Sequence, residues 1–181
     1  MEESTPQISP IPKQAFLECM KSDIFWITNC ISVGPYPEED KHEILKQNNI
    51  THILNVCEYE GKFKETIETA WLPIEDLKKI PNGLVIDCLE TMHDFLENSQ
   101  AKIYVHCVAG QNRSPNIIWL YLIACGLSPE EARMLISRAT LDAVVGHPLI
   151  VDDKHTKLAS KHGIKNFLPL RREEIILPSF L

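Results

Sequence analysis

The feature that most constrains the fold is a short apolar segment that leads through a polar loop into a long apolar stretch. Residues 103–106 have strand character, and residues 107–112 connect them to Arg113. Ser114-Pro115 then opens an apolar run through residue 125 that is typical of a buried helix. Serine and proline are favoured where a helix begins. The pattern therefore predicts a strand, a loop at a helix N-terminus, and a buried helix.

Elsewhere the chain alternates short strands with helical segments, which predicts an α/β domain with a mostly parallel central sheet flanked by helices. The expected strands lie at residues 24–33 (a strand pair or a hairpin closing on Gly34-Pro35), 50–56, 71–74 and 102–106. The expected helices lie at residues 15–21, 38–47, 84–98, 117–125, 130–139 and 151–162. Glycines at 126 and 163 are expected to end two of these helices, and a capping box at residues 128–131 to begin another.

The length of 181 residues predicts one domain of ordinary size. Prolines among polar residues favour a flexible N-terminal arm at residues 1–14, and the main folded domain is expected over residues 15–163. The tail at residues 164–181 is apolar around a charged block. We expect it to pack on the domain or to lie at an interface with another subunit or a partner.

Composition argues against several classes of function. A net charge of −7 argues against nucleic acid or an anionic membrane as the main partner. The sequence has no apolar run long enough to span a membrane and no secretory leader, so a cytoplasmic protein is expected. Its six cysteines show neither close pairs nor a metal-ligand pattern, which favours thiols in a reducing compartment and predicts no metal and no cofactor.

The loop itself suits an anion and a nucleophile. Amides at a helix N-terminus favour negative charge, and a helix N-terminus with a neighbouring cation lowers the pKa of a thiol such as Cys107. Gly110 lets the loop curl, and Arg113 offers a planar fork to two phosphoryl oxygens. Ser114 can hydrogen-bond the thiolate as it leaves, and His106 is expected to be buried and to orient the loop. The predicted phosphate-binding loop is Val108, Ala109, Gly110, Gln111, Asn112 and Arg113.

The run His106-Cys107, two residues, Gly110, two residues, Arg113-Ser114 resembles the signature of the cysteine-based protein tyrosine phosphatase superfamily. It looks most like the small, atypical dual-specificity phosphatases, and the resemblance extends over residues 24–140. It implies phosphomonoester hydrolysis through a cysteinyl-phosphate, with phosphotyrosine and phosphoserine or phosphothreonine in proteins as the substrates and phosphorylated proteins as the partners.

The resemblance also implies a general acid. In the family it is an aspartate about thirty residues before the cysteine, on a loop just after a strand, and Asp76 fits that position. Glu75 beside it is the alternative.

Cys57 lies where some relatives carry a second cysteine that traps the oxidised nucleophile as a disulfide. The resemblance therefore implies a possible redox partner for Cys107. The other interpretation is a small buried residue at the end of a strand.

Other substrates and a different class of function stay open. Relatives that act on inositol lipids tend to carry lysine or arginine in the loop, whereas Val108, Ala109, Gln111 and Asn112 are uncharged. The negative net charge of the chain disfavours a phosphatase of RNA 5′ phosphates. A pseudophosphatase that only binds phosphoproteins usually lacks the cysteine or the arginine, and both are present here.

Overall fold

The structure is a computed structural model and describes residues 23–61, 63, 67–98 and 100–166. The expected N-terminal arm and the helix at residues 15–21 lie outside these residues. So does the expected tail, apart from its first three positions.

The core of the fold is a five-stranded sheet in the order β1-β2-β5-β3-β4. The strands are β1 (Phe25–Trp26), β2 (Ile31–Gly34), β3 (His52–Asn55), β4 (Glu68–Trp71) and β5 (Ile103–His106). β2, β5, β3 and β4 run parallel, and only β1 is antiparallel to its neighbour. The α/β class and the mostly parallel sheet are confirmed. The expected strand pair in residues 24–33 is the β1-β2 hairpin.

β5 occupies the centre of the sheet, and all four of its residues are buried. Its last residue, His106, lies beside Gly34 of β2 and Asn55 of β3. Because the three strands are parallel, their carboxyl ends meet at one edge. Ligands of open α/β sheets bind at that edge, so this register fixes where a site forms.

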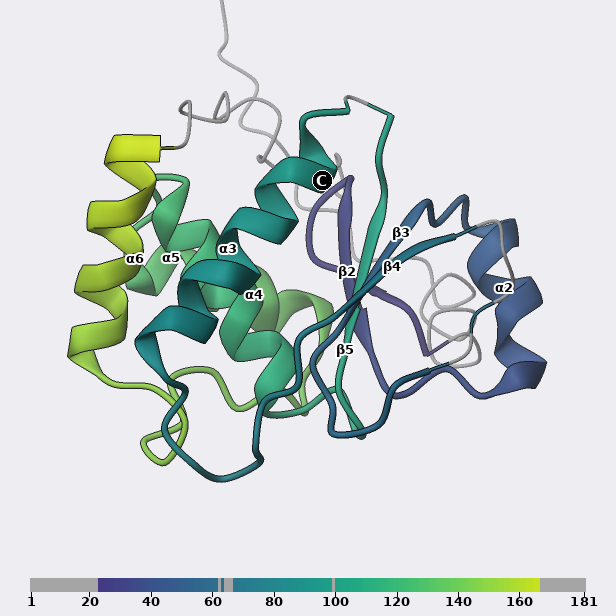
Figure 1. Cartoon of the computed structure of the whole chain (residues 1–181), viewed down its shortest axis with the longest axis horizontal. Helices are drawn as coiled ribbons and strands as arrows, with labels where there is room; N and C mark the ends of the chain where they lie inside the picture. Colours follow the sequence, from purple (N-terminus) through teal and green to yellow (C-terminus); the bar gives the residue numbers. More distant parts are fainter. Residues whose placement is uncertain (1–22, 62, 64–66, 99, 167–181) are drawn as a thin grey trace, which may run out of the picture.

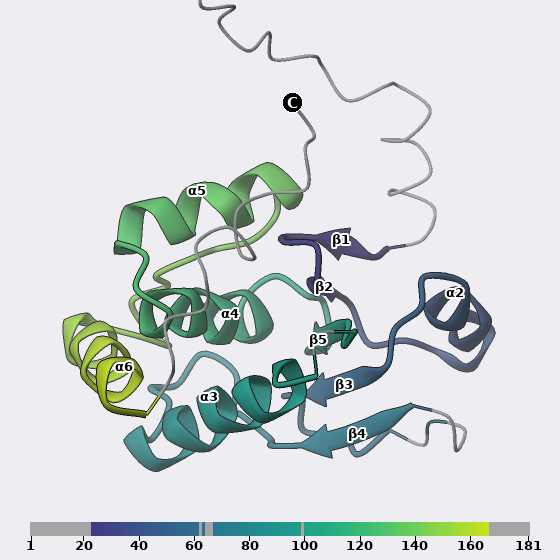
Figure 2. The same cartoon turned by 90° about the horizontal axis from the view of Figure 1, so that it is seen from above.

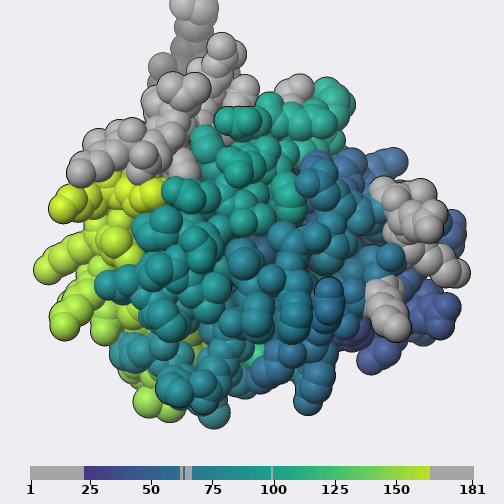
Figure 3. All heavy atoms as spheres, viewed as in Figure 1, coloured from purple at the N-terminus to yellow at the C-terminus, as the bar shows by residue number. Residues whose placement is uncertain are grey.

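Helices cover both faces of the sheet (Figures 1 and 2). The larger layer consists of α3 (Asn82–Leu96), α4 (Arg113–Ala124), α5 (Pro129–Ala139) and α6 (Asp153–Asn166). The other face carries the short 3₁₀ turn η1 (Glu39–Lys41) and α2 (His42–Gln47). In Figure 3, α3 in teal lies beside α6 in yellow-green, although the two are distant in sequence.

α4 is the central helix of the larger layer, and every one of its residues is buried. It contacts α3, α5 and α6 as well as β5. This agrees with its almost wholly apolar sequence, which is typical of a helix surrounded by protein. α4 ends before Gly126, which has a φ of +101°, and α5 begins at the capping box of Ser128 and Glu131. Both expectations are confirmed.

The expected strand at residues 71–74 was placed too late, because β4 ends at Trp71. The backbone N–H groups of Leu72 and Ile74 still donate to the carbonyls of Asn55 (2.9 Å) and Val56 (3.1 Å). Pro73 lies between these two donors, so its nitrogen faces away from β3, where an edge strand tolerates a proline. The true strand begins with exposed polar residues, since β4 is an edge strand, and it therefore lacks an apolar pattern.

Gly163 does not end α6, as the sequence suggested, but lies inside the helix. A Cβ atom at this position would lie 1.8 Å from the carbonyl oxygen of Ala124 at the end of α4. The glycine therefore permits a close approach of two helices.

Among the described residues, no helix is both long and apolar enough to cross a bilayer.

Candidate active site

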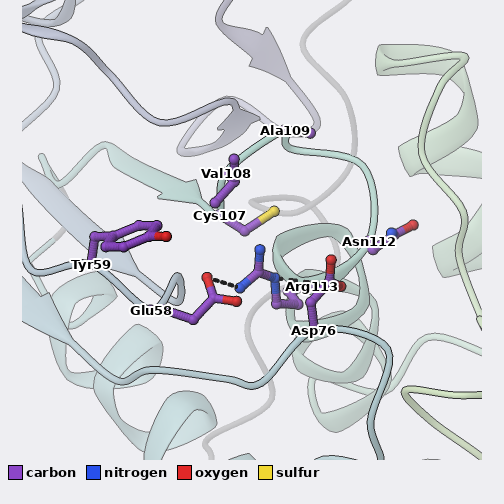
Figure 4. Close-up of a pocket in the computed structure, with 8 residues that line it drawn as sticks. All are labelled: Glu58, Tyr59, Asp76, Cys107, Val108, Ala109, Asn112 and Arg113. Atoms are coloured by element: carbon purple, nitrogen blue, oxygen red, sulfur yellow. Dashed lines mark ion pairs between the residues drawn. The ribbon is translucent and has the colours of Figure 1, made fainter.

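A pocket of about 330 Å³ opens at the carboxyl edge of the sheet. Its walls come from the segments that follow β3, β4 and β5, three strands that end at this edge. Figure 4 shows the lining residues, which are Glu58, Tyr59, Asp76, Cys107, Val108, Ala109, Asn112 and Arg113. Segments distant in sequence thus meet at the edge of the sheet where the parallel strands end.

Cys107 lies at the base of the pocket and is only 2% exposed. Its Sγ accepts hydrogen bonds from the Gly110 N–H and the Ser114 hydroxyl, both at 3.3 Å. Burial alone would raise the pKa of this thiol. The hydrogen bonds from Ser114 and Gly110 and the positive charge of Arg113 outweigh burial, so the pKa of Cys107 is lowered. The site therefore favours the thiolate, which is the nucleophilic form.

Gly110 gives the loop its curvature. Its φ of +72° lies in the left-handed region, where other residues are strained. A Cβ atom here would also lie 2.5 Å from the backbone carbonyl carbon of Gly34. The loop thus rests directly on the end of β2, and only glycine fits at this contact.

Arg113 is the first residue of α4, and it is 3% exposed. Its Nη1 donates to the Ile74 carbonyl at 3.1 Å and lies 2.5 Å from Oε2 of Glu58. Its Nε is buried and has no hydrogen-bond partner among the described residues, with Asp76 Oδ1 at 3.6 Å. Burial disfavours the charge, but Glu58, Cys107 and Asp76 outweigh it and raise the pKa of Arg113. The guanidinium is therefore charged and keeps donors for an oxyanion.

Glu58 is a pocket residue that the sequence analysis missed. It lies just beyond β3, and Figure 4 shows its carboxylate against the guanidinium of Arg113. The hydrogen bond with Arg113 lowers the pKa of Glu58, against the smaller effect of burial. Its position in the sequence could have indicated it. A carboxylate that closely follows a buried parallel strand lies at the ligand-binding edge of the sheet.

Asp76 lines the pocket, with its carboxylate near Arg113, whereas Glu75 is not among the lining residues. Glu75 instead pairs with Lys78 at 2.8 Å and is largely exposed. The backbone N–H of Leu77 donates to Asp76 Oδ1 at 3.0 Å, and Leu77 has a φ of +53°. A leucine in the left-handed region is strained, and such strain concentrates at functional sites.

His106 lies fully buried behind the loop. Its Nδ1 lies 3.2 Å from the carbonyl oxygen of Cys107, and its ring packs against Tyr36 and Tyr104 at centroid distances of 5.4 and 5.8 Å. Burial lowers the pKa of His106 to about 4, so the ring is neutral at neutral pH. The Nδ1–H tautomer then donates to Cys107, which fixes the carbonyl next to the thiol.

Cys57 is also fully buried, two positions beyond β3. Its thiol donates to the carbonyl of Tyr59 at 3.2 Å. Burial raises the pKa of Cys57, and the negative charge of Cys107 contributes in the same direction. The two thiols are therefore near enough to interact electrostatically, and their pKa values are shifted in opposite directions.

The remaining loop residues divide between the pocket and its outer side. Val108, Ala109 and Asn112 line the pocket, whereas Gln111 does not. The Asn112 side chain points away from Cys107 in Figure 4.

Within the part of the chain that the structure describes, no group of three or more potential metal ligands lies close together.

Comparisons with known proteins identify the family. The family model for the dual specificity phosphatase catalytic domain matches residues 31–138. The chain is 32% identical over 151 residues to protein tyrosine phosphatase type IVA 2 of Mus musculus, and the match covers 81% of this chain and 87% of the relative.

Two of the solved structures that share the fold serve as examples. A mouse putative dual specificity phosphatase complexed with zinc tungstate superposes with a TM-score of 0.68 at 16% identity, covering 94% of this chain and 100% of that one. PTPMT1 in complex with PI(5)P superposes with a TM-score of 0.63 at 17% identity, covering 79% and 96%.

The strand, the cysteine loop and the buried helix therefore define a phosphatase of the cysteine-based protein tyrosine phosphatase superfamily. Within that superfamily, the chain belongs to the dual-specificity phosphatase family. It is a hydrolase of the protein-tyrosine and dual-specificity class.

Proposed function

We propose that the chain removes phosphate from phosphotyrosine and from phosphoserine or phosphothreonine in proteins, through a cysteinyl-phosphate intermediate. The observation that carries the proposal is the environment of Cys107. Its sulfur accepts hydrogen bonds from Gly110 and Ser114 in a pocket that also holds the buried cation of Arg113. A stabilised thiolate beside a guanidinium with free donors suits attack on a phosphoryl group.

In the first step, the thiolate of Cys107 attacks phosphorus, a sulfur–phosphorus bond forms, and the bond to the ester oxygen breaks. Asp76 donates a proton to the departing oxygen, which leaves as the alcohol or phenol. Arg113 and the loop amides bind the equatorial oxygens while charge redistributes. The position of Asp76 in the pocket, near Arg113, supports this role over Glu75.

In the second step, water attacks the cysteinyl-phosphate. Asp76, now a carboxylate, accepts a proton from the water, and the sulfur–phosphorus bond breaks to release inorganic phosphate. The Ser114 hydroxyl donates a hydrogen bond to the departing thiolate, a role supported by its contact with Sγ. His106 orients the loop through its contact with the Cys107 carbonyl.

The charge of the pocket favours a single phosphoryl group on a protein side chain. Among the lining residues, Arg113 is the one cation, and the carboxylates of Glu58 and Asp76 lie beside it. A headgroup with several phosphates would bring further negative charge against these carboxylates. PTPMT1, whose structure contains PI(5)P, shares only the fold with this chain, at 17% identity. The test therefore includes a monophosphorylated inositol lipid.

A cytoplasmic location is part of the proposal. The five cysteines among the described residues are all free thiols, and the reaction needs Cys107 to stay reduced. A reducing compartment meets that requirement.

The test measures phosphate release by the wild-type chain, by Cys107→Ser and by Cys30→Ser, a matched change outside the pocket. The substrates are a phosphotyrosine peptide, a phosphothreonine peptide, a soluble analogue of PI(5)P and a 5′-triphosphorylated RNA. We expect release from the peptides by the wild type and by Cys30→Ser, and none by Cys107→Ser. Peptide binding without release from any substrate would instead establish a binding protein, and preference for the lipid or the RNA would overturn the substrate class.

A further inference from the structure

Three carbonyl groups of the phosphate-binding loop are held on its outer side by donors from three other residues. The Val108 carbonyl accepts from the Tyr36 N–H at 2.9 Å, and the Gln111 carbonyl accepts from the Val144 N–H at 2.8 Å. The Asn112 carbonyl accepts from Nδ2 of Asn116 at 2.6 Å and from the backbone N–H of the same residue at 3.3 Å. Nδ2 of Asn116 is the only side-chain donor among these.

These anchored carbonyls decide where the amides point. In a trans peptide the C=O of one residue and the N–H of the next point in opposite directions, and the described residues contain no cis peptide bond. Holding the carbonyls of Val108, Gln111 and Asn112 outward therefore directs the N–H groups of Ala109, Asn112 and Arg113 toward the pocket. Inward N–H groups are what an anion-binding loop requires.

Asn116 uses its whole amide for this purpose. It is fully buried on α4, one turn beyond Arg113. Its Nδ2 also donates to the Val144 carbonyl at 2.9 Å, and its Oδ1 accepts from the Gly146 N–H at 2.8 Å. One side chain thus binds the phosphate loop to residues 144–146. That segment supports the loop from outside and does not line the pocket.

We propose that Asn116 is a positioning residue for anion binding. It holds the Asn112 carbonyl outward, which keeps the Arg113 N–H directed at the phosphoryl oxygens. Through Val144 it also helps to hold the Gln111 carbonyl outward, which keeps the Asn112 N–H directed at the same oxygens. The proposal rests on the proposed function only in taking a phosphoryl group as the anion. Without the Asn116 side chain, the Asn112 carbonyl keeps only the longer bond from the backbone N–H of residue 116, and residues 144–146 lose their bonds to this helix position. A loop held less firmly lets its carbonyls turn toward the phosphate, which they repel.

The test uses inorganic phosphate as the probe and follows backbone amides by NMR in ¹⁵N-labelled full-length chain. In the wild type, phosphate should move the amide proton resonances of Asn112 and Arg113 downfield, since hydrogen bonds to an anion form there. Unchanged resonances for both amides at saturating phosphate would overturn the proposal, and this result does not depend on any variant.

The variants are Asn116→Ala, which removes all three side-chain hydrogen bonds, and Asn116→Asp, which keeps an acceptor for Gly146 but loses the donors. The control is Ser128→Ala, which removes the cap of α5 and so lowers stability at a place away from the loop. All are measured at a temperature at which circular dichroism shows them folded.

We expect both Asn116 variants to bind phosphate about tenfold more weakly, while Ser128→Ala binds like the wild type. Wild-type affinity in a folded Asn116 variant would contradict the proposal, as would equal weakening in Ser128→Ala. Because phosphate binding needs no turnover, failure of the chain to hydrolyse peptides would leave this result interpretable. The two proposals can therefore fail separately.

Discussion

Glu58 in the segment after β3 and Arg113 at the start of α4 form an ion pair with 2.5 Å between Oε2 and Nη1. The same Nη1 donates to the carbonyl of Ile74, so this end of the guanidinium is held twice. Nε, by contrast, has no hydrogen-bond partner within the described part of the chain. The pair therefore fixes one end of the guanidinium and leaves donors at the other for an oxyanion.

This relationship gives the first prediction. Glu58→Ala should lower kcat/KM for a phosphotyrosine peptide about tenfold, because Arg113 loses the acceptor that orients it. Glu58→Gln keeps an oxygen acceptor without the charge and should recover most of the loss. Tighter phosphate binding by Glu58→Ala would contradict the prediction, since it would mean that Glu58 competes with the substrate for Arg113.

The second prediction concerns the general acid. Asp76→Asn should lower kcat about a hundredfold for phosphothreonine peptides, whose alkoxide leaving group needs a proton. The loss should be much smaller with p-nitrophenyl phosphate, whose leaving group is a weak base. Glu75→Gln, the matched change at the neighbouring exposed carboxylate, should keep wild-type activity. If Glu75→Gln showed the larger loss on phosphothreonine, the roles of the two residues would be exchanged.

A third prediction concerns oxidation. Low doses of peroxide should convert the Cys107 thiolate to a sulfenic acid, and Cys57 should then form a disulfide with it, releasing water. Peptide mass spectrometry should detect the Cys57–Cys107 crosslink, and dithiothreitol should restore activity. Cys57→Ser should instead accumulate irreversible sulfinic Cys107. Over-oxidised Cys107 in the wild type, with Cys57 still a free thiol, would leave Cys57 as a packing residue.

The fourth prediction follows from His106, whose pKa falls from 6.5 in the unfolded chain to about 4 in the folded one. Between these values the unfolded state binds more protons, so acid favours unfolding. The contribution of neutral His106 to the free energy of unfolding is fully present above pH 6.5 and is lost as the pH falls toward 4. The loss at pH 5 relative to pH 8 is about 2 kcal/mol. Urea unfolding of His106→Asn should show a pH dependence smaller by that amount, and an unchanged dependence would contradict the prediction.

A fifth prediction compares two glycines by thermal unfolding. Gly163→Ala should lower the melting temperature by about 5 °C, because the new methyl group meets the Ala124 carbonyl and forces α4 and α6 apart. Gly83→Ala in the first turn of α3 meets nothing within 4 Å and should raise it slightly. Equal shifts in the two variants would show that α6 is not packed closely on α4.

The sequence predicted the features that local residues determine. The strand before Cys107, the loop with Gly110 and the helix opened by Ser114 follow from neighbouring residues, as does the capping box of α5. Contacts between distant segments were not predictable in this way. Glu58 reaches Arg113 only because β3 and β5 lie side by side, and Gly163 is needed only because another helix passes close to it.

The contact between Gly110 and Gly34 limits how this enzyme can be re-engineered. Each glycine fills a place that admits no side chain: a Cβ at Gly110 would strike the backbone of Gly34, and a Cβ at Gly34 would strike Tyr104 and the Asp23 carbonyl. A mutant library aimed at new substrates should therefore return only glycine at both positions. The exposed neighbours Val108, Ala109 and Gln111 are the positions at which such a library can vary.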